Sequence, residues 1–577
     1  MTKFTRRGLL GAGGAIVGLA GCSEEIVSEP EGRITISPDT RPGYPGTVTF
    51  EHGVASGDPL TDRVILWTRV TIDGEYPQAP VPISYGVFAD EAKTQPVVYG
   101  VASANPGSDF TVKVDAEGLE PGTAYYYQFV AKTTSGDISS PIGRTKTTAA
   151  SGDAPVRFAV ISCSNFPFGY FHAYREISQD GALDAVIHLG DYIYEYGVDG
   201  YGGSVGQTIG RNHEPPLEIV SLGDYRMRHA QYKLDPDLQA AHAAAPWLCT
   251  WDDHESTNNS YRNGAENHNP ENNEGNWSDR KQAAVQAYLE WMPVRDPEAG
   301  QLRESIYRKF DFGDVATVMC LESRLTGRSD EISWFAEIGG LSPAEIPMAA
   351  AATMVKVNDN SRTMLGTMQE SWLSQELKRS VEGGKPWQVL ANQVIMAQVR
   401  SPNFSQTLTA EQIAAQENGF IQQLIPFSQL GLAWNLDAWD GFPAARNRLY
   451  NSASAAGARL VTLTGDTHTA WANTLVDSND ERRGVEFGCT SVTSPGFGTY
   501  MTDVEDLGQM FADANPEVDW HKTDGKGWTL VTLTKDTASA VFNEVSDVTQ
   551  ETYTASEVAR FSSKIDGTSM TALTRDS

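Results

Sequence analysis

Hydrophobic and polar residues alternate along the first part of the chain, up to about residue 148. Runs such as ISYGVFAD and TAYYYQFVAK are rich in β-branched and aromatic residues and are separated by Gly, Pro and Asp turns. This pattern is typical of strands that have one buried face. Residues 47–148 are therefore predicted to form a small all-β sandwich domain, to which no chemistry is assigned.

A different pattern begins near Pro155, where short apolar runs are separated by helical segments. Such runs indicate buried strands, so residues 155–545 are predicted to form an α/β (α+β) core of sheets flanked by helices. Residues 23–46, rich in Pro, Glu and Gly, are predicted to be a linker, and residues 546–577 a polar, mobile C-terminal tail. In the β domain, LEPGTAYYYQFVA resembles the end of a fibronectin type III-like domain.

Five apolar runs of the second region end in polar residues. RFAVISC ends at Cys163, DAVIHLGD at Asp191, PWLCTWDDHE at Asp252, Asp253 and His254, PWQVLANQ at Asn392, and RLVTLTGDTH at Asp466 and His468. Open α/β sheets bind ligands in the crevice outside the carboxyl ends of their strands. We therefore expect these distant segments to deliver their side chains to one place.

Taken one at a time, these polar residues have ordinary explanations, because an Asp after a strand is usually a cap or turn residue and a single His is usually structural. Together they would concentrate several negative charges in one crevice, which is costly unless cations neutralise them. Two or more metal ions are therefore predicted, with the candidate residues Cys163, Asp191, Tyr194, Asp253, His254, Asp466 and His468.

The charge of the chain excludes some partners. Among its 577 residues, 44 Lys and Arg stand against 74 Asp and Glu, which gives a formal net charge of −30. This excess disfavours binding to a phosphate backbone or to an anionic membrane surface, so no nucleic acid is expected as a partner.

The first 22 residues have the features of an export signal. TRRGLL contains the twin arginines Arg6 and Arg7, and an uncharged stretch that is too short to span a bilayer follows them. The stretch ends in LAGC, which resembles a bacterial lipobox, so Cys22 is the predicted site of lipidation. The protein is thus expected to use the twin-arginine export machinery and to be periplasmic or extracellular, held at the membrane only by a lipid anchor.

The other cysteines are widely spaced and contain no CxxC pair, which argues against a zinc knuckle or a small disulfide scaffold. Cys249, Cys320 and Cys489 are expected to pack as buried apolar residues. Only Cys163 falls among the candidate metal ligands.

Several motifs resemble a known family. GDYIYE is a GDxxY motif, DDHE stands where metallophosphoesterases of the purple acid phosphatase kind have a GNHE-like element, and GDTH stands where they have GHxH. In greater detail, blocks such as SCSNFPFGYFHAY, TMLGTMQESWL and WDGFPAARNRL resemble PhoD-type alkaline phosphatases/phosphodiesterases. This resemblance covers roughly residues 48 to 540.

The resemblance implies a mixed centre of Fe3+ and Ca2+. Carried over by position, Cys163, Asp191, Tyr194 and His468 would hold the iron, and Asp191 would also bridge to calcium, whose coordination Asp253 and Asp466 would complete. Thiolate and phenolate suit a transition ion of high charge, whereas carboxylates suit calcium. Cys163 and Asp466 replace an aspartate and a histidine of the purple enzymes, which argues against a simple iron–zinc site.

Two neighbouring residues each have two candidate roles. His254 is the candidate for protonating the leaving alkoxide or orienting the phosphate, with a structural histidine as the alternative. Asp252 is either a further calcium ligand or an acceptor for His254.

The predicted function is that of an exported, metal-dependent phosphoesterase that hydrolyses small phosphate monoesters or diesters by metal-activated water. One alternative function is that of a phosphodiesterase, phospholipase or phosphotriesterase, which would have the same fold and a different substrate. Another is a surface lipoprotein that binds calcium or phosphate without turnover.

Overall fold

The computed structural model describes residues 39–577 except 74–78, 343, 410, 412–424, 502–503 and 505. The predicted export signal, with Arg6, Arg7 and Cys22, lies outside these residues. No helix among the described residues is both long enough and apolar enough to cross a membrane.

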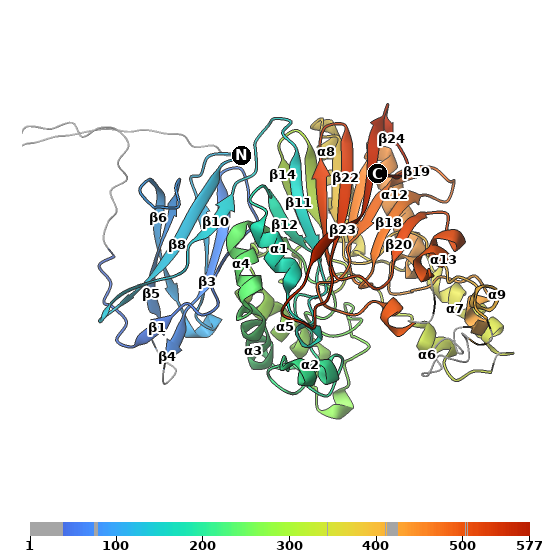
Figure 1. Cartoon of the computed structure of the whole chain (residues 1–577), viewed down its shortest axis with the longest axis horizontal. Coiled ribbons are helices and arrows are strands. Elements are labelled where there is room, and N and C mark those ends of the chain that lie inside the picture. The colour runs from blue at the N-terminus through green and yellow to red at the C-terminus, as the bar shows by residue number, and fades with distance from the viewer. Residues whose placement is uncertain are drawn as a thin grey trace, which may run out of the picture. The chain divides into compact units, whose positions relative to one another are not determined.

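Two large mixed sheets form the centre of the fold (Figure 1). The first runs in the order β24 (Ser569–Met570), β23 (Ala555–Asp566), β22 (Thr537–Val545), β21 (Gly527–Leu533), β11 (Val156–Ile161), β12 (Ala185–His188), β13 (Pro246–Cys249), β2 (Val54–Gly57), β3 (Arg63–Arg69) and β7 (Thr111–Glu117), with β25 (Thr574–Arg575) paired to β23. The second runs in the order β14 (Arg308–Phe312), β15 (Ala316–Cys320), β16 (Trp387–Ala391), β17 (Leu460–Thr464), β19 (Arg482–Gly488), β18 (Ala470–Val476) and β20 (Val518–Lys522).

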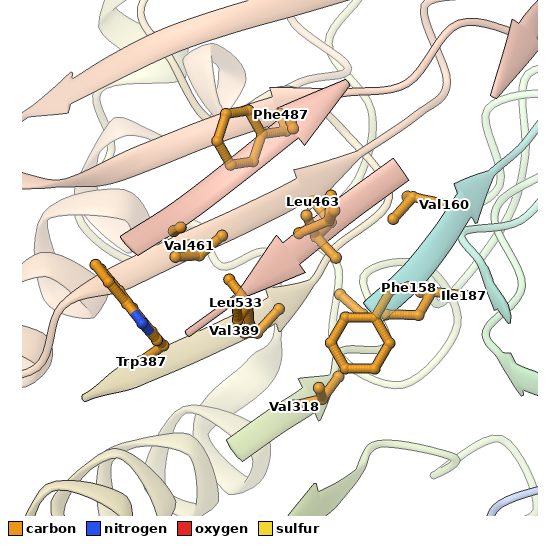
Figure 2. Packing of buried hydrophobic residues seen from close by; sticks show 14 of the residues in the cluster. Phe158, Val160, Ile187, Val318, Trp387, Val389, Val461, Leu463, Phe487 and Leu533 are labelled. Carbon is orange, nitrogen blue, oxygen red and sulfur yellow. The ribbon is translucent and has the colours of Figure 1, made fainter. Parts of the chain in front are cut away.

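The two large sheets pack face to face through apolar side chains. Figure 2 shows Phe158 and Ile187 of the first sheet close to Val318 of the second, and the same buried cluster continues through Val389 and Leu463. Strands β11, β12 and β13 are parallel neighbours, as are β15, β16, β17 and β19. Because parallel strands in the middle of a layered fold are buried on both faces, several of them are largely apolar, as in β12 (AVIH) and β15 (ATVMC).

Helices cover the outer faces of both sheets (Figure 1). Those against the first sheet are α1 (His172–Gln179), α3 (Leu222–Lys233), α4 (Pro236–Ala244) and α5 (Trp277–Trp291). Those against the second are α8 (Gly366–Glu382), α12 (Pro443–Ala456) and α13 (Leu507–Ala514). The other helices of the described residues are α2 (Gly203–Ile209), α6 (Trp334–Ile338), α7 (Ile346–Val357), α9 (Phe404–Thr407), η1 (Pro106–Ser108), η2 (Phe166–Phe168), η3 (Pro270–Asn272), η4 (Trp439–Gly441) and η5 (Phe497–Tyr500). The predicted core of sheets flanked by helices is therefore confirmed.

The predicted N-terminal β region is all-β, but it is not separate from the core. A third sheet runs β10 (Gly143–Lys146), β8 (Ala124–Thr133), β5 (Val81–Phe88) and β6 (Pro96–Ala104), with β9 (Gly136–Ser139) on β8, and β1 (Thr47–Thr49) pairs with β4 (Thr71–Asp73). Its apolar face packs on β2, β3 and β7. These three strands extend the first large sheet, because β2 pairs in parallel with β13.

The prediction of a mobile tail over residues 546–577 is wrong. Strand β23 pairs with β22 over most of its length, and β24 and β25 pair with β23. Phe561, Met570 and Leu573 are buried in the core between the large sheets. Polar residues dominate this segment because its strands lie at the edge of the sheet, where much of the surface faces water.

Candidate metal centre

The predicted site residues lie in the loops that follow β11, β12, β13 and β17. Three overlapping groups of potential ligands have their ligand atoms within 4.8 Å of one another, and they consist of Cys163, Asp191 and His468; Asp191, Asp253 and His254; and Asp252, Asp253 and Asp466. The structure therefore brings the candidate residues from four strand ends to one place.

The backbone at this place is strained. Cys163, Asp191, Asp466 and His468 have φ angles of 60°, 56°, 63° and 60°, a region that residues with a Cβ atom rarely adopt. Such strained residues cluster at functional sites, where the surrounding structure must hold them. Four residues with this backbone conformation in one place support a functional role for the region, independently of their chemistry.

The backbone at Gly190 explains why the GDxxY motif begins with a glycine. Its φ is +109°, and a Cβ atom built on it would lie 2.3 Å from the backbone nitrogen of Asp252. Only glycine thus allows the loop after β12 to approach the loop after β13 this closely. The approach places Asp191 beside the acidic residues that follow β13.

Tyr194 and His468 face Asp191. The Tyr194 hydroxyl donates to Asp191 Oδ2 at 3.0 Å and lies 3.2 Å from His468 Nε2. His468 Nδ1 lies 3.1 Å from the carbonyl oxygen of Pro495, which can only accept a hydrogen bond. Nδ1 therefore carries the proton and Nε2 presents its lone pair toward Asp191, as in a metal-ligating histidine with an oriented ring. Burial lowers the pKa of His468 to about 3, which keeps the ring neutral.

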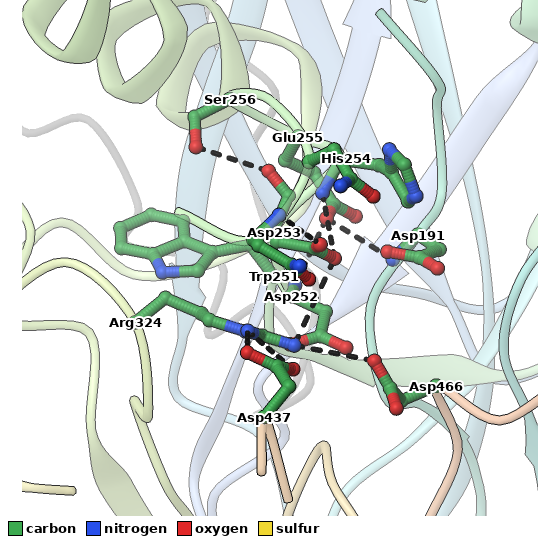
Figure 3. A network of polar contacts seen from close by, with 12 residues as sticks. Asp191, Trp251, Asp252, Asp253, His254, Glu255, Ser256, Arg324, Asp437 and Asp466 are labelled. Carbon is green, nitrogen blue, oxygen red and sulfur yellow. Dashed lines mark hydrogen bonds and ion pairs between the residues drawn. The ribbon is translucent and has the colours of Figure 1, made fainter. Parts of the chain in front are cut away.

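Arg324 lies among the carboxylates on the other side of the site (Figure 3). Its guanidinium donates to Asp252 Oδ1 at 2.5 Å, to Asp437 at 2.8 Å and to Asp466 Oδ1 at 3.2 Å. The arginine side chain is completely buried, and burial of a charge is tolerated only when it is paired in this way. Part of the negative charge of this group is thus offset by the protein itself.

His254 forms a buried pair with Glu195. Its Nδ1 lies 2.6 Å from Glu195 Oε2, and the other Glu195 oxygen accepts from Thr257 Oγ1 and the backbone of Asn258. Burial lowers the pKa of His254, but the carboxylates of Glu195 and Asp253 outweigh burial and the pKa is raised well above its usual range. The imidazole is therefore held as a proton donor whose Nε2 remains available to the site.

Glu255 joins the two acidic loops. Its carboxylate accepts from the backbone nitrogens of Asp191 at 3.0 Å, Asp252 at 2.9 Å and Tyr192 at 2.7 Å. Burial raises its pKa to about 7. Because the carboxylate is occupied by three backbone donors, Glu255 holds the geometry of the loops rather than offering a ligand.

The donor set fits metal ions. Within the described part of the protein, Asp191 Oδ1 and Asp252 Oδ2 are buried without a hydrogen-bond partner. Burial raises the pKa of the Cys163 thiol, the Tyr194 phenol and the Asp191 carboxyl well above their usual ranges. A bound cation would favour the ionised form of each group and would occupy the unpartnered oxygens.

Sequence reasoning missed Glu195, Glu255, Arg324 and Asp437. Arg324 follows β15, another apolar strand that ends in charged residues, so the strand-end rule could have found it. Glu195 stood within the GDYIYE motif but was given no role. Asp437 lies in a loop with no comparable signal in its sequence.

The chain is similar to known proteins over most of its length. A family model described as PhoD-like phosphatase matches residues 158–542, and one described as PhoD-like phosphatase, N-terminal domain, matches residues 37–149. The chain is 35% identical to alkaline phosphatase D from Bacillus subtilis (strain 168) over 563 residues, which covers 95% of this chain and 85% of that protein. A solved structure titled "Structure of PhoD" superposes with a TM-score of 0.72 at 31% identity and covers 94% of each chain.

Proposed function

Since the chain belongs to the PhoD-like phosphatase family and is a phosphoric ester hydrolase, we propose that it hydrolyses small phosphate monoesters and diesters with metal ions held at the candidate metal centre. The observation that carries the proposal is the meeting of Cys163, Asp191, His468, Asp253 and Asp466 at the ends of parallel strands. A binding protein without turnover is set aside, because the relatives are phosphatases.

The metals assigned to the centre are Fe3+ and Ca2+. Cys163, Asp191, Tyr194 and His468 offer sulfur, oxygen and nitrogen donors that suit ferric iron. Asp253 and Asp466 offer carboxylates that suit calcium, with Asp191 shared between the two ions. Asp252 would complete the calcium site through Oδ2, the oxygen that Arg324 leaves without a partner.

When bound, such ions polarise a water molecule and neutralise the charge that develops on the phosphate oxygens. The residues of the chain supply the rest. His254, charged through its contact with Glu195, would donate a proton from Nε2 to the departing alkoxide, and Glu195 would keep the imidazole oriented. Arg324 and Glu255 hold the acidic loops in place where the phosphate would bind.

An assay at alkaline pH on phosphate mono-, di- and triesters, with and without a calcium chelator, tests this proposal. Monoester hydrolysis should be present and should be lost on chelation. A metal-loaded protein that cleaves none of the three ester classes would contradict the function, and full activity in excess chelator would contradict the role of calcium.

We also propose that the protein is exported by the twin-arginine route and anchored by lipid at Cys22, which places it in the periplasm or outside the cell. The support is the order of Arg6, Arg7, the short apolar stretch and the LAGC motif. Replacing both arginines by lysine should retain the folded protein in the cytoplasm. Unchanged export of that variant would refute the twin-arginine assignment.

A further inference from the structure

A cavity of about 750 Å3 lies beside the candidate metal centre. Its walls come from η2 and α2, from the loop before η5, from the turn between β20 and β21, and from the segment after β22. A cavity of this size holds a ligand much larger than a phosphate ion. None of the metal-ligand candidates lines it, so it is a separate compartment.

Three residues of the cavity wall also contact residues of the metal centre. Pro495 accepts the hydrogen bond from His468 Nδ1 at 3.1 Å, and the backbone nitrogen of Thr493 donates to Cys163 at 3.4 Å. The ring of Tyr201 lies 6.4 Å from that of Tyr194, centroid to centroid. A group attached to a phosphate at the metals could therefore extend past these residues into the cavity.

Lys526 is the cationic group of the cavity that lacks a carboxylate partner. Its ammonium donates only to the backbone carbonyls of Asp524 and Gly525, each at 3.2 Å, and it forms no ion pair within the described part of the chain. Lys522 differs, because it lies 2.9 Å from Asp524 and 3.6 Å from Glu544. Lys526 thus retains hydrogen-bonding capacity for an oxygen of a bound molecule.

The other walls suit a polar organic group with a flat face. Hydroxyl groups are supplied by Ser204, Thr499, Tyr500, Ser546, Thr554 and Ser556. The ring centroids of Phe168 and Tyr201 are 4.8 Å apart, and the two rings form an aromatic wall. His254 and Glu195 do not line the cavity, so an alcohol that leaves beside His254 and a group held in the cavity would occupy different places.

We propose that this cavity is a subsite for the second ester group of a phosphate diester, and that Lys526 is its specificity-determining residue. A monoester has no such group, so the subsite discriminates between the two substrate classes. The inference rests on the proposed phosphoesterase function. It assigns Lys526 a contact with an oxygen of the group that stays on the phosphate, whereas bond cleavage itself occurs at the metal centre.

The test compares p-nitrophenyl phosphate with the p-nitrophenyl ester of thymidine 5′-phosphate, which share a leaving group and differ in the second ester group. Burial lowers the pKa of Lys526 to about 8, so the assay is run at pH 7, where the amine is charged. In Lys526→Met, the ratio of kcat/KM for the diester to kcat/KM for the monoester should fall at least about tenfold, through KM. Lys526→Arg should restore most of the ratio.

Lys535→Met is the matched control. Lys526 directly precedes β21, whereas Lys535 follows the opposite end of β21, lies 3.7 Å from Asp153 and does not line the cavity. The control should keep the wild-type ratio. An unchanged ratio in Lys526→Met, or equal losses for both esters with metal content intact, would overturn the subsite. If Lys526→Met does not fold, Lys526→Gln is used, and inhibition by thymidine 5′-phosphate is compared with inhibition by inorganic phosphate. Relative to wild type, the variant should lose more inhibition by thymidine 5′-phosphate than by inorganic phosphate. An unchanged ratio of the two inhibition constants overturns the subsite. A wild-type enzyme that cleaves neither ester contradicts the proposed function instead.

Discussion

Asp191 belongs to two of the three ligand groups of the candidate metal centre. It follows β12 with a positive φ, it accepts the Tyr194 hydroxyl, and its Oδ1 is buried without a partner in the described structure. Shared coordination of two cations, as proposed above, would occupy a carboxylate in this position.

Asp191→Asn should therefore abolish turnover of every ester, by at least about 100-fold in kcat, because it would remove the charge proposed to bridge the two ions without changing the size of the side chain. Steady-state kinetics and elemental analysis of the variant are the measurements. The neighbouring Asp199 lies in a loop outside the site and Asp199→Asn is the control. Normal kcat with normal metal content in Asp191→Asn would contradict the assignment.

His254 permits a separate prediction, because protonation of the leaving group matters only when that group is a strong base. His254→Ala should reduce the hydrolysis of alkyl phosphates by about 100-fold and that of p-nitrophenyl phosphate by less than about tenfold. Glu195→Gln should show the same selectivity, since it removes the charge that holds the imidazole protonated. Equal losses for both leaving groups would argue against proton donation by His254.

The residues of the site could be predicted where the sequence combined a strand end with a metal-binding side chain. Cys163, Asp191 and His468 met both conditions, and the structure groups them. Glu195 was missed because a single charged residue near an apolar run is usually at the surface, and only packing shows that it is buried.

At the scale of elements, parallel strands were predicted more accurately than edge strands. The buried strands β12 and β17 are short apolar runs, and this pattern is distinctive because both faces are covered. Strand β23 was missed because its exposed positions are polar, so the segment has the composition of a tail. The continuity of β2 with β13 depends on long-range pairing that no local pattern reveals.

Phe561 tests the structural role of β23. Phe561→Ala should lower the free energy of unfolding by about 3 kcal/mol, because the ring is buried between β22 and the second large sheet. Glu557→Ala on an exposed position of the same strand should change it by less than about 0.5 kcal/mol. If both substitutions had the same negligible effect on thermal unfolding, this segment would be a mobile tail after all.

At the scale of the whole molecule, one buried lysine should make the free energy of unfolding depend on pH. Lys233, the last residue of α3, is buried with its ammonium 3.2 Å from His242 Nε2 and 4.6 Å from the centre of the Trp67 ring. Burial lowers its pKa from 10.5 to about 7. Between these values the unfolded chain binds a proton that the folded protein does not, so stability should rise with pH.

The comparison of wild type with Lys233→Met isolates this effect. The difference in unfolding free energy should shift in favour of the wild type between about pH 7 and about pH 10.5, by at most about 1.4 kcal/mol per pH unit, and should be constant below pH 7. Urea unfolding at a series of pH values measures it. A difference that does not vary with pH would show that Lys233 is charged in the folded protein.

Elemental analysis combined with visible absorption tests most directly whether the strand ends of this fold hold iron and calcium together, as proposed. Native protein should contain both metals, and an absorption band from tyrosinate or thiolate bound to iron should shift or weaken in Tyr194→Phe. A colourless, active enzyme that contains zinc alone would contradict the assignment of Cys163, Asp191, Tyr194 and His468 to iron.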